Sequence, residues 1–426
     1  MTLKGRRVLV GLSGGIACYK ACDLVRQLRQ LGATVQVVMT ENAREFVTPL
    51  TLQTLSGARV GTSTFDLTEE SEIGHIRLAD TADVVVVAPA TANVMAKMAH
   101  GIADDLLTTV LLATRAPIIV APAMNVHMWE HVATQANVQT LVERGARVVG
   151  PASGSLACGY EGAGRLAEAG DIIEAVTIAV TPQDLAGERI LVSAGPTREA
   201  LDPVRYLTNH SSGKMGYAIA RVARRRGATV TVVSGPVALP APAGVRVVSV
   251  ESAADMARAL RAEFMRATVL VMAAAVADYR PAAALDRKLK KSVGGRRLEL
   301  QQNADIVAGL ATHKGTRIVV GFAAETHDVV AEARRKLREK GLDLIVANDV
   351  TAEGARFGGD TNIVRMIDTV GLDEALPVLP KDEVADRILD WVAAHRRGAP
   401  RAVTTRRSGR GRVSRLRSRR GPRPSA

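Results

Sequence analysis

The stretch APAMNVHMW, residues 121–129, directly follows a short apolar run at residues 118–120 that has the pattern of a buried parallel strand. Pro122 is expected to stop this strand, because proline has no backbone N–H to donate. Asn125 would then lie just past the carboxyl end of a strand, where open α/β sheets bind their ligands. An uncharged amide there can hold a carboxylate without protonating it. The alternative is a strand-to-helix turn in which Asn125 only caps the next helix.

A glycine-rich turn, GLSGGIACYK at residues 11–20, stands between the first expected strand and the first expected helix. Its spacing is not GxGxxG, so a dinucleotide-binding fingerprint is not supported. Ser13, Gly14 and Gly15 precede a helix N-terminus, where backbone N–H groups and the helix dipole suit a phosphate. A tight turn without a ligand is the alternative.

Residues 1–182 are predicted to form a flavodoxin-like or Rossmann-like three-layer α/β domain. ADVVVVA at 82–88 has the composition of a buried central strand, and PATAN at 89–93 leaves its carboxyl end. Thr91 and Asn93 either hydrogen-bond a polar ligand or cap the following helix. The expected elements are strands at 7–10, 34–39, 82–88, 118–120 and 146–149, and helices at 16–31 and 94–100.

The stretch GSLACGYEGAGRL at residues 154–166 contains too many glycines for a regular helix or strand. We expect a mobile flap, which is a frequent place for functional residues. Cys158 lies in its middle, and an exposed thiol there favours a chemical role over a structural one. Cys18 and Cys22 are four apart in a helical pattern and are expected to be small core residues.

Residues 187–396 repeat the α/β pattern after TPQDLAG at 181–187, which reads as a linker, and predict a second doubly wound, Rossmann-like domain. SSGK in this half resembles a P-loop, but Thr208 replaces the first glycine and Met215 the Ser or Thr, so we reject a Walker motif. Strands are expected at 189–193, 229–233, 269–277, 318–321 and 344–346. Helices are expected at 217–226, from the end of residues 322–326 through 340, and at 382–394.

The charge is concentrated at the C-terminal end. The chain of 426 residues has a formal net charge of +13, but residues 396–426 hold twelve Arg and no Lys or acid, which leaves 44 basic against 43 acidic residues elsewhere. Residues 397–426 contain too little apolar surface to fold. We expect a disordered appendage there, and contact with nucleic acid or another anionic surface is the alternative.

The composition also bears on the compartment. Three cysteines in a long chain favour a reducing cytoplasm over a disulfide framework. The basic start followed by VLVGLSGGIAC mimics a short signal peptide, but Ser13, Gly14 and Gly15 interrupt its apolar run. No apolar run approaches the ~20 residues needed to span a bilayer, so no membrane segment is expected.

Together, these motifs resemble the bifunctional phosphopantothenoylcysteine decarboxylase / phosphopantothenate–cysteine ligase family of bacterial coenzyme A synthesis, over about residues 5–395. Two mild departures are Thr91, where the family usually has Ser, and Ala304, where it usually has Pro. The motifs are GLSGGIACYK, GHIRLAD, PATAN, PAMNVHMW and ACGYEGAGRL in the first half, and GPTREALDPVRYLTNHSSGKMG, AAAVADYRP, KLKK, NADIV and GFAAET in the second.

The resemblance implies an FMN-dependent decarboxylase in the first half. It implies His75 as the catalytic base, Asn125 as the anchor of the substrate carboxylate and Cys158 as the acid. A histidine titrates near neutral pH, as a base requires, and a closing flap can deliver an acid. The implied FMN contacts are Ser13, Gly14, Gly15, Ile16, Ala17, Thr40, Pro89, Ala90, Thr91, Asn93 and Met124.

The second half, by the same resemblance, joins cysteine to 4′-phosphopantothenate with CTP and Mg²⁺ through an acyl-cytidylate. Asn209 and Lys288 would carry the two half-reactions, although the basic run RKLKK at 287–291 could also be a solvated turn. Negative charge grows on the triphosphate, so Lys side chains and Mg²⁺ are the expected stabilisers. The implied CTP contacts are Asp278, Lys288, Ala304, Asp305, Ile306, Val307, Phe322, Lys336 and Lys340, and the metal ligands stay open.

The family resemblance also implies trimers of the flavin domain and dimers of the ligase domain, which together would build a dodecamer. The product would be 4′-phosphopantetheine. Two other classes are a non-catalytic flavin-binding regulator and a nucleic-acid-binding protein. The joint presence of His75, Asn125 and Cys158 argues against the first, and the second depends on the tail alone.

Overall fold

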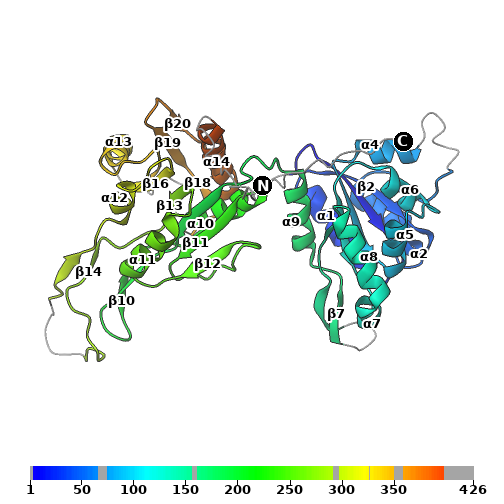
Figure 1. Cartoon of the computed structure of the whole chain (residues 1–426), viewed down its shortest axis with the longest axis horizontal. Helices are drawn as coiled ribbons and strands as arrows, with labels where there is room; N and C mark the ends of the chain where they lie inside the picture. The colour runs from blue at the N-terminus through cyan, green and yellow to red at the C-terminus, as the bar shows by residue number, and fades with distance from the viewer. Residues whose placement is uncertain are drawn as a thin grey trace, which may run out of the picture.

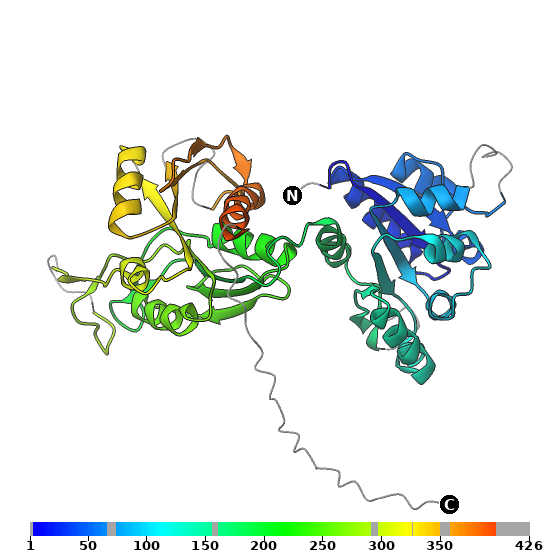
Figure 2. The same ribbon diagram turned by 45° about the horizontal axis from the view of Figure 1, so that its top comes forward.

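The computed structural model describes residues 3–65, 74–155, 161–290, 297–325, 327–349 and 358–397. It contains two α/β units that follow one another along the chain (Figures 1 and 2). Each is a mainly parallel sheet with helices on both faces, so the predicted fold class is confirmed. The tail was predicted at 397–426; Arg397 ends the last helix, and residues 398–426 lie outside the described residues.

The first unit has a five-stranded parallel sheet in the order β2-β1-β3-β4-β5, which is the flavodoxin-like order. Its strands are β1 (Arg7–Leu12), β2 (Thr34–Met39), β3 (Val84–Ala90), β4 (Ile118–Pro122) and β5 (Arg147–Val148). One face packs on α1 (Cys18–Gln30), α3 (Pro49–Ser56) and α9 (Ala169–Val180). The other packs on α4 (Gly74–Thr81), α5 (Ala92–His100), α6 (Leu106–Ala113) and α8 (Val132–Glu143).

Successive residues of β1 show why this sheet needs two helical layers. Val8 and Val10 enter the core on the α1 side, whereas Leu9 between them enters the core on the α5 side. Strand residues alternate between faces, and both faces of a parallel sheet are covered. Every residue of β3 is buried, as its continuous apolar sequence predicts.

The glycine-rich flap is more regular than we predicted. Residues Ala152–Ser155 (β6) and Glu161–Arg165 (β7) form an antiparallel hairpin, so the prediction of no strand in this stretch was wrong. Gly154 and Gly162 have φ angles of 145° and 151°, which other residues rarely adopt. The glycines therefore permit the unusual backbone of a hairpin rather than preventing pairing.

The second unit has an eight-stranded sheet in the order β12-β11-β8-β13-β16-β17-β19-β20. Its first six strands are parallel and follow the Rossmann order. These are β8 (Arg189–Ala194), β11 (Thr229–Ser234), β12 (Arg246–Ser249), β13 (Val269–Met272), β16 (Ile318–Glu325) and β17 (Leu344–Asp349). The antiparallel β19 (Val364–Asp368) and β20 (Asp373–Ala375) extend one edge.

Helices again cover both faces of this sheet. Helices α10 (Lys214–Arg225) and α14 (Lys381–Arg397) cover one, and α11 (Ala253–Phe264), α12 (Ile306–Ala311) and α13 (Val329–Glu339) cover the other. Short antiparallel pairs project from the loops, namely β9 (Arg198–Ala200) with β10 (Tyr206–Thr208) and β14 (Tyr279–Pro281) with β15 (Leu300–Gln302). A further pair joins β18 (Thr361–Asn362) to β21 (Leu379–Pro380).

Several strand lengths differ from the prediction, and β13 and β16 differ most. The strand expected at 269–277 ends at Met272, because the chain turns to run beside the loop after β8, where Ala275 pairs with Pro196. The strand expected at 318–321 continues to Glu325, since β17 on its other side is long enough to pair with it. The edge strands β19 and β20 were not predicted.

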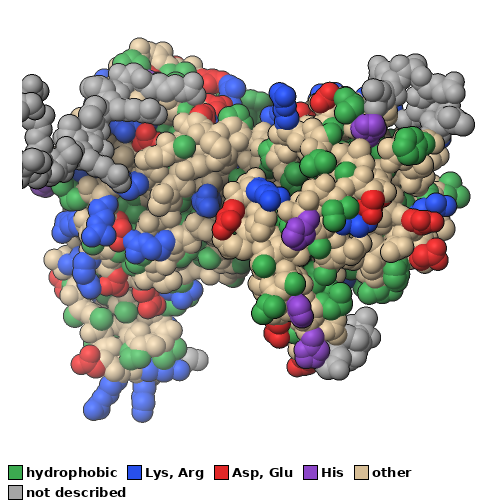
Figure 3. Space-filling view, turned by 45° about the vertical axis from the view of Figure 1, so that its right-hand side comes forward, with side chains coloured by type: hydrophobic (Ala, Val, Ile, Leu, Met, Phe, Trp, Pro, Cys, Tyr) green, Lys and Arg blue, Asp and Glu red, His purple; other side chains and the backbone are tan. Residues whose placement is uncertain are grey.

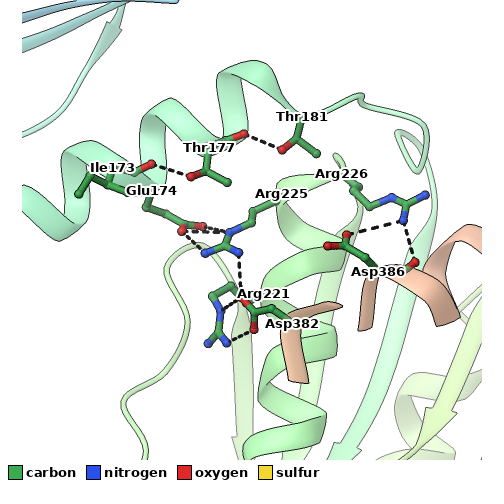
Figure 4. A network of polar contacts seen from close by, with 9 residues as sticks. All are labelled: Ile173, Glu174, Thr177, Thr181, Arg221, Arg225, Arg226, Asp382 and Asp386. Carbon is green, nitrogen blue, oxygen red and sulfur yellow. Dashed lines mark hydrogen bonds and ion pairs between the residues drawn. The ribbon is translucent and has the colours of Figure 1, made fainter. Parts of the chain in front are cut away.

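The two units meet at a charged junction (Figure 4). Arg225 of α10 donates to Glu174 of α9 at 2.8 Å and to Asp382 of α14 at 3.1 Å. The next residue, Arg226, pairs with Asp184 at 2.7 Å and with Asp390 at 2.8 Å. Two adjacent arginines at the end of α10 thus bind carboxylates of the first unit, the connecting segment and the last helix.

Among the described residues, we find no helix that combines the length and the apolar composition required to cross a bilayer.

Candidate functional site

The first candidate site is a pocket of about 390 Å³ at the carboxyl ends of β1, β3 and β4. The glycine turn, the PATAN segment and the APAMNVHMW stretch meet there, although they lie far apart in the sequence. Residues from the root of the flap hairpin complete the wall. The pocket is lined by Gly14, Gly15, Ile16, Ala17, Tyr19, Lys20, Thr91, Ala123, Met124, Asn125, Met128, Gly164, Arg165 and Leu166.

The glycine turn is held in place by Ser13. Its buried hydroxyl donates to the carbonyl of Pro89 at 2.7 Å and accepts from the N–H of Thr91 at 2.9 Å. Gly14 packs so closely on the next loop that a Cβ would lie 2.4 Å from Cβ of Asn42, whereas a Cβ on Gly15 would meet only Thr91, at 3.7 Å. Gly14 is therefore required by packing, and Gly15 leaves room for a ligand beside α1.

Asn125 occupies the position that the sequence indicates, and it also acts as a cap. Its Oδ1 accepts from the N–H of His127 at 2.8 Å, which makes Asn125 the N-cap of α7 (Val126–Glu130). The residue lines the pocket at the same time. The two interpretations of Asn125 are thus compatible.

The flap hairpin is anchored against this turn. The N–H of Met124 donates to the carbonyl of Gly164 at 3.0 Å. A Cβ on Gly162 would lie 2.8 Å from Val126, so the absence of a side chain allows the hairpin to pack on α7. Cys158 itself lies outside the described residues.

Several residues implied by the resemblance do not line the pocket. Pro89 and Ala90 belong to the buried end of β3, and Thr40 caps α2 (Glu41–Arg44) by accepting from the N–H of Ala43 at 3.3 Å. Asn93 is exposed on α5. His75 is half-buried at the start of α4 and is not among the residues that line the pocket of Asn125.

Four residues that line the pocket were not predicted from the sequence. Tyr19 and Lys20 extend the first turn of α1 beyond Ile16, and Arg165 and Leu166 come from the hairpin. The helical spacing of Ile16, Tyr19 and Lys20 was a usable signal, because residues three and four apart share a face. The hairpin residues could not be placed once the flap was expected to be irregular.

The second candidate site lies on the loops that follow β8, β13 and β16. Gly195 and Gly213 both have φ of 73°, and a Cβ on either would lie within 2.8 Å of Val237. The loops after β8 and β11 therefore pack tightly together. Asn209 lies between β10 and Gly213; it is exposed, and its Nδ2 donates to the carbonyl of Val276 at 3.0 Å.

Asn303 connects two segments that the family resemblance implies in CTP binding, the one at Asp278 and the one at 304–307. Its Nδ2 donates to the carbonyl of Ala277 at 2.8 Å, and its backbone N–H donates to the carbonyl of Asp278 at 2.7 Å. Its Oδ1 accepts from Arg280 at 2.7 Å. These bonds bring Asp278 beside the segment 304–307.

Two lysines of α13 point at carboxylates of this region. Lys336 pairs with Glu325 at the end of β16 at 2.6 Å, and Lys340 pairs with Asp305 at 2.9 Å. Asp305 also caps α12 by accepting from the N–H of Ala308 at 2.9 Å. Burial alone would raise the pKa of the Asp305 carboxyl, but the hydrogen bond from Ala308 and the ammonium of Lys340 hold it below its usual value.

The remaining implied CTP residues differ in exposure. Phe322 and Val307 are half-buried and Ala304 is exposed, so their side chains can border a ligand. Ile306 is buried in the core below α12, so only its backbone can contact one. Lys288 is exposed on the loop after β14. In Figure 3, Lys and Arg side chains gather at the tip of the part of this half that projects downward, where the pairs β9–β10 and β14–β15 extend from the sheet.

No group of three or more His, Cys, Asp or Glu side chains suited to a metal ion is found within the ranges that the structure describes. The carboxylates of the second site, Glu325 and Asp305, are each paired with a lysine.

Models of two protein families match the chain. The model described as Flavoprotein matches residues 1–181, and the model described as DNA/pantothenate metabolism flavoprotein C-terminal domain matches residues 185–395. Each covers one of the two α/β units.

Curated relatives match nearly the whole chain. The coenzyme A biosynthesis bifunctional protein CoaBC of Bacillus subtilis is 50% identical over 396 residues, which are 92% of this chain and 98% of that protein. The protein of the same name from Escherichia coli (strain K12) is 47% identical over 397 residues, with the same coverage. That from Mycobacterium bovis is 47% identical over 404 residues, or 91% of this chain and 96% of the relative.

Solved structures match each half separately. The C-terminal domain of a coenzyme A biosynthesis bifunctional protein CoaBC is 44% identical with a TM-score of 0.44, and covers 50% of this chain and 98% of its own. A PPC decarboxylase mutant complexed with pantothenoylaminoethenethiol is 33% identical with a TM-score of 0.37, and covers 40% of this chain and 96% of its own.

Proposed function

The chain belongs to the family of coenzyme A biosynthesis bifunctional proteins, and from this premise we propose how its two halves divide the work. The protein is a bifunctional enzyme of coenzyme A biosynthesis with decarboxylase and ligase activities. We assign the FMN-dependent decarboxylase to residues 1–182 and the CTP-dependent ligase to residues 187–396. The observation that carries this assignment is the pocket that joins the Gly14–Gly15 turn, Thr91 and Asn125 in the first unit.

The pocket fits a flavin mononucleotide. Gly15 leaves space in front of the N-terminus of α1, where a phosphate is favoured by the helix dipole. Ile16, Met124, Met128 and Leu166 supply an apolar wall for a flat ring system. When bound, FMN supplies the redox chemistry that lets the carboxylate of phosphopantothenoylcysteine leave as CO₂.

The protein's own part is to hold the substrate and move protons. Asn125 holds the substrate carboxylate as an uncharged donor, His75 takes a proton, and Cys158 returns one from the flap. His75 does not line the pocket of Asn125 within one chain, so we propose that a second copy supplies it. The proposed trimer of flavin domains would provide such a neighbouring copy.

The ligase half joins cysteine to 4′-phosphopantothenate through an acyl-cytidylate. We propose that the triphosphate of CTP takes Lys336 from Glu325 and Lys340 from Asp305, because a polyanion attracts a lysine more strongly than one carboxylate does. Mg²⁺ would bind mainly to the triphosphate, as it commonly does in nucleotide sites. Asn209 and Lys288 act in the two half-reactions, and dimers of this half together with the flavin trimers would form a dodecamer.

We further propose that the enzyme works in the cytoplasm, since Cys18 and Cys22 are free thiols. We also propose that the basic tail has no role in either reaction.

The decisive experiment incubates the full chain with 4′-phosphopantothenate, cysteine, Mg²⁺ and CTP, and identifies products by mass. We expect 4′-phosphopantetheine, and far less product when ATP replaces CTP. Absence of both phosphopantothenoylcysteine and 4′-phosphopantetheine would refute the ligase assignment, and accumulation of phosphopantothenoylcysteine without further conversion would refute the decarboxylase.

A variant tests the proposed acid. Cys158→Ser should release CO₂ but yield a product two hydrogens lighter than 4′-phosphopantetheine, because a hydroxyl donates its proton poorly. His75→Asn should release no CO₂. Full turnover by Cys158→Ser would show that the flap is only a lid.

A further inference from the structure

Asp202, in the turn between β9 and β10, has a side chain with no exposed surface. One carboxylate oxygen accepts from the backbone N–H groups of Val204 at 2.8 Å and Arg205 at 2.9 Å. The other accepts from Nε of Arg205 at 2.9 Å and from its Nη2. The Arg205 guanidinium and the backbone N–H groups hold the pKa of the Asp202 carboxyl well below its usual value, so it is charged at neutral pH.

The same pair binds a distant loop. The carboxylate of Asp202 accepts from the backbone N–H of Leu289 at 3.1 Å, and Nη2 of Arg205 donates to the carbonyl of Leu289 at 2.8 Å. Both backbone polar groups of Leu289 are thus held by one Asp–Arg pair. The N–H of Leu285 donates to the carbonyl of Leu201 at 3.1 Å and ties the loop a second time.

This contact fixes the direction of the basic loop. Leu289 is half-buried, whereas its neighbours Lys288 and Lys290 are exposed. Two bonds, one to the N–H and one to the C=O of Leu289, restrain the backbone on both sides of this residue, and so restrain where the two lysines leave the loop. Charge-assisted bonds of this kind are stronger than neutral ones.

The pair also lies close to Asn209 along the chain. Arg205 is followed by β10, which pairs with β9, and then by Asn209. The guanidinium of Arg198 lies 4.5 Å from the ring centre of Tyr206, which further holds β10 in place. One rigid turn therefore stands between Asn209 and the loop of Lys288.

We propose that Asp202 is a positioning residue of the ligase, which fixes Lys288 relative to Asn209 through Arg205 and the backbone of Leu289. The role rests on the functions proposed above for Lys288 and Asn209. Asp202 touches no substrate. Its buried charge serves to orient a loop that would otherwise be exposed and free to move.

The kinetic test compares Asp202→Asn with Asp255→Asn in the full-length protein. Asp255 is the control, because it also accepts from a backbone N–H, in the capping box of α11, and pairs with an arginine three residues on, Arg258, but makes no bond to residues 287–290 of the basic loop, which the structure describes. We expect the ligase kcat of Asp202→Asn to fall about tenfold or more (about 1.4 kcal/mol of barrier) with little change in KM for CTP. Decarboxylation of added phosphopantothenoylcysteine should stay unchanged in both variants.

A double mutant separates positioning from a general structural effect. The variant that combines Asp202→Asn with Lys288→Gln should ligate no more slowly than Lys288→Gln alone. Two substitutions that disturb the same function do not have additive effects on the rate. Additive losses would overturn the proposal.

Limited trypsin digestion tests the contact between Asp202 and the basic loop without an activity assay. Cleavage after Lys288 or Lys290 should be about fivefold faster in Asp202→Asn than in the wild type, with no change in the Asp255→Asn control. Unchanged cleavage would overturn the proposal even if activity fell. If the wild type showed no ligation, the proposed ligase function itself would be refuted, whatever the cleavage result. Should Asp202→Asn not fold, Arg205→Lys, which keeps the charge but loses the planar fork, gives the same two readouts.

Discussion

At the scale of single residues, Asn125 has two roles that one substitution can separate. Asn125→Asp keeps an N-cap of equal quality for α7, so the melting temperature should not change. The new carboxylate would repel the carboxylate of the substrate, and decarboxylation should fall by about 100-fold or more. Thermal melting and CO₂ release measure the two effects.

The control for this prediction is Asp105→Asn, which exchanges the same two residue types at the N-cap of α6, away from the pocket. It should leave both measurements near the wild-type values. A decarboxylase that tolerated Asn125→Asp would mean that Asn125 is only a cap.

Asp386 makes the junction between the units sensitive to pH. Burial raises the pKa of its carboxyl to about 6, and the neighbouring carboxylates of Asp390 and Asp382 add to the effect while Arg226 and Arg225 oppose it. Because the folded pKa is raised, the stability contributed by the protonated form is complete below about pH 4 and is lost as the pH rises through about 6.

Asp386→Asn should therefore stabilise the protein at pH 8, by about 1 kcal/mol after allowance for partial exposure, since the amide carries no charge to bury. The gain should vanish near pH 4, where the wild-type carboxyl is already neutral. Urea unfolding at the two pH values is the measurement. An equal gain at both values would disprove the pH dependence.

Most residues of the first site could be predicted from the sequence, because glycines and prolines mark the ends of the strands at which the pocket lies. Thr91 caps α5 and lines the pocket, as Asn125 does for α7, so capping and binding were not true alternatives. Lys20 was missed although its helical spacing from Ile16 was a usable signal, whereas Arg165 was missed because its place in the pocket depends on how the hairpin packs. The roles of the individual site residues stay predictions.

At the scale of elements, the flap hairpin offers a test of packing. Gly162 has φ of 151°, and a Cβ there would lie 2.8 Å from Val126. Gly162→Ala should therefore lift the hairpin from α7 and reduce decarboxylation about tenfold or more, while ligation stays unchanged. Gly170→Ala in α9, where no atom lies within 4 Å, is the control and should be neutral or slightly stabilising. Assays of both activities decide the outcome, and normal decarboxylation by Gly162→Ala would show that close hairpin docking is not required.

Strand order was easier to predict than strand length. Alternating apolar strands and helices predicted parallel sheets, and the observed orders are those of the predicted fold class. The ends of β13 and β16 depend on their neighbours in the sheet, which periodicity does not reveal. The edge strands β19 and β20 were missed since short strands such as Asp373–Ala375 carry little apolar pattern.

At the scale of the whole molecule, the Arg-rich tail is not expected to assist either reaction. Removal of residues 397–426 should leave both rates within about threefold of the wild type, because the segment has too few apolar side chains to dock on either unit. Steady-state assays of each half test this. A loss above about tenfold in either activity would give the tail a function.

The two halves should also work when separated. Each has its own sheet and two hydrophobic cores, and a core of the second unit also includes Leu185 of the connecting segment. Residues 1–182 should therefore bind FMN and decarboxylate, and residues 187–396, which lack Leu185, should ligate without flavin. The ion pairs at the junction between the units determine how much stability each fragment loses when the halves are separated. In the ligase fragment, Arg225 loses Glu174 but keeps Asp382, and Arg226 loses Asp184 but keeps Asp390, so neither guanidinium is left unpaired.

The ligase fragment should accordingly be less stable than the same unit in the full chain by about 1–3 kcal/mol, yet remain folded. Adding Glu174→Gln to the full chain should reproduce only a part of this loss, since Arg226 keeps Asp184. Denaturant unfolding of the three proteins gives the free energies, and assays of each fragment give the activities. If neither fragment is soluble and active at concentrations that permit assembly, the two units do not fold independently and the proposed boundary at 182–187 is wrong.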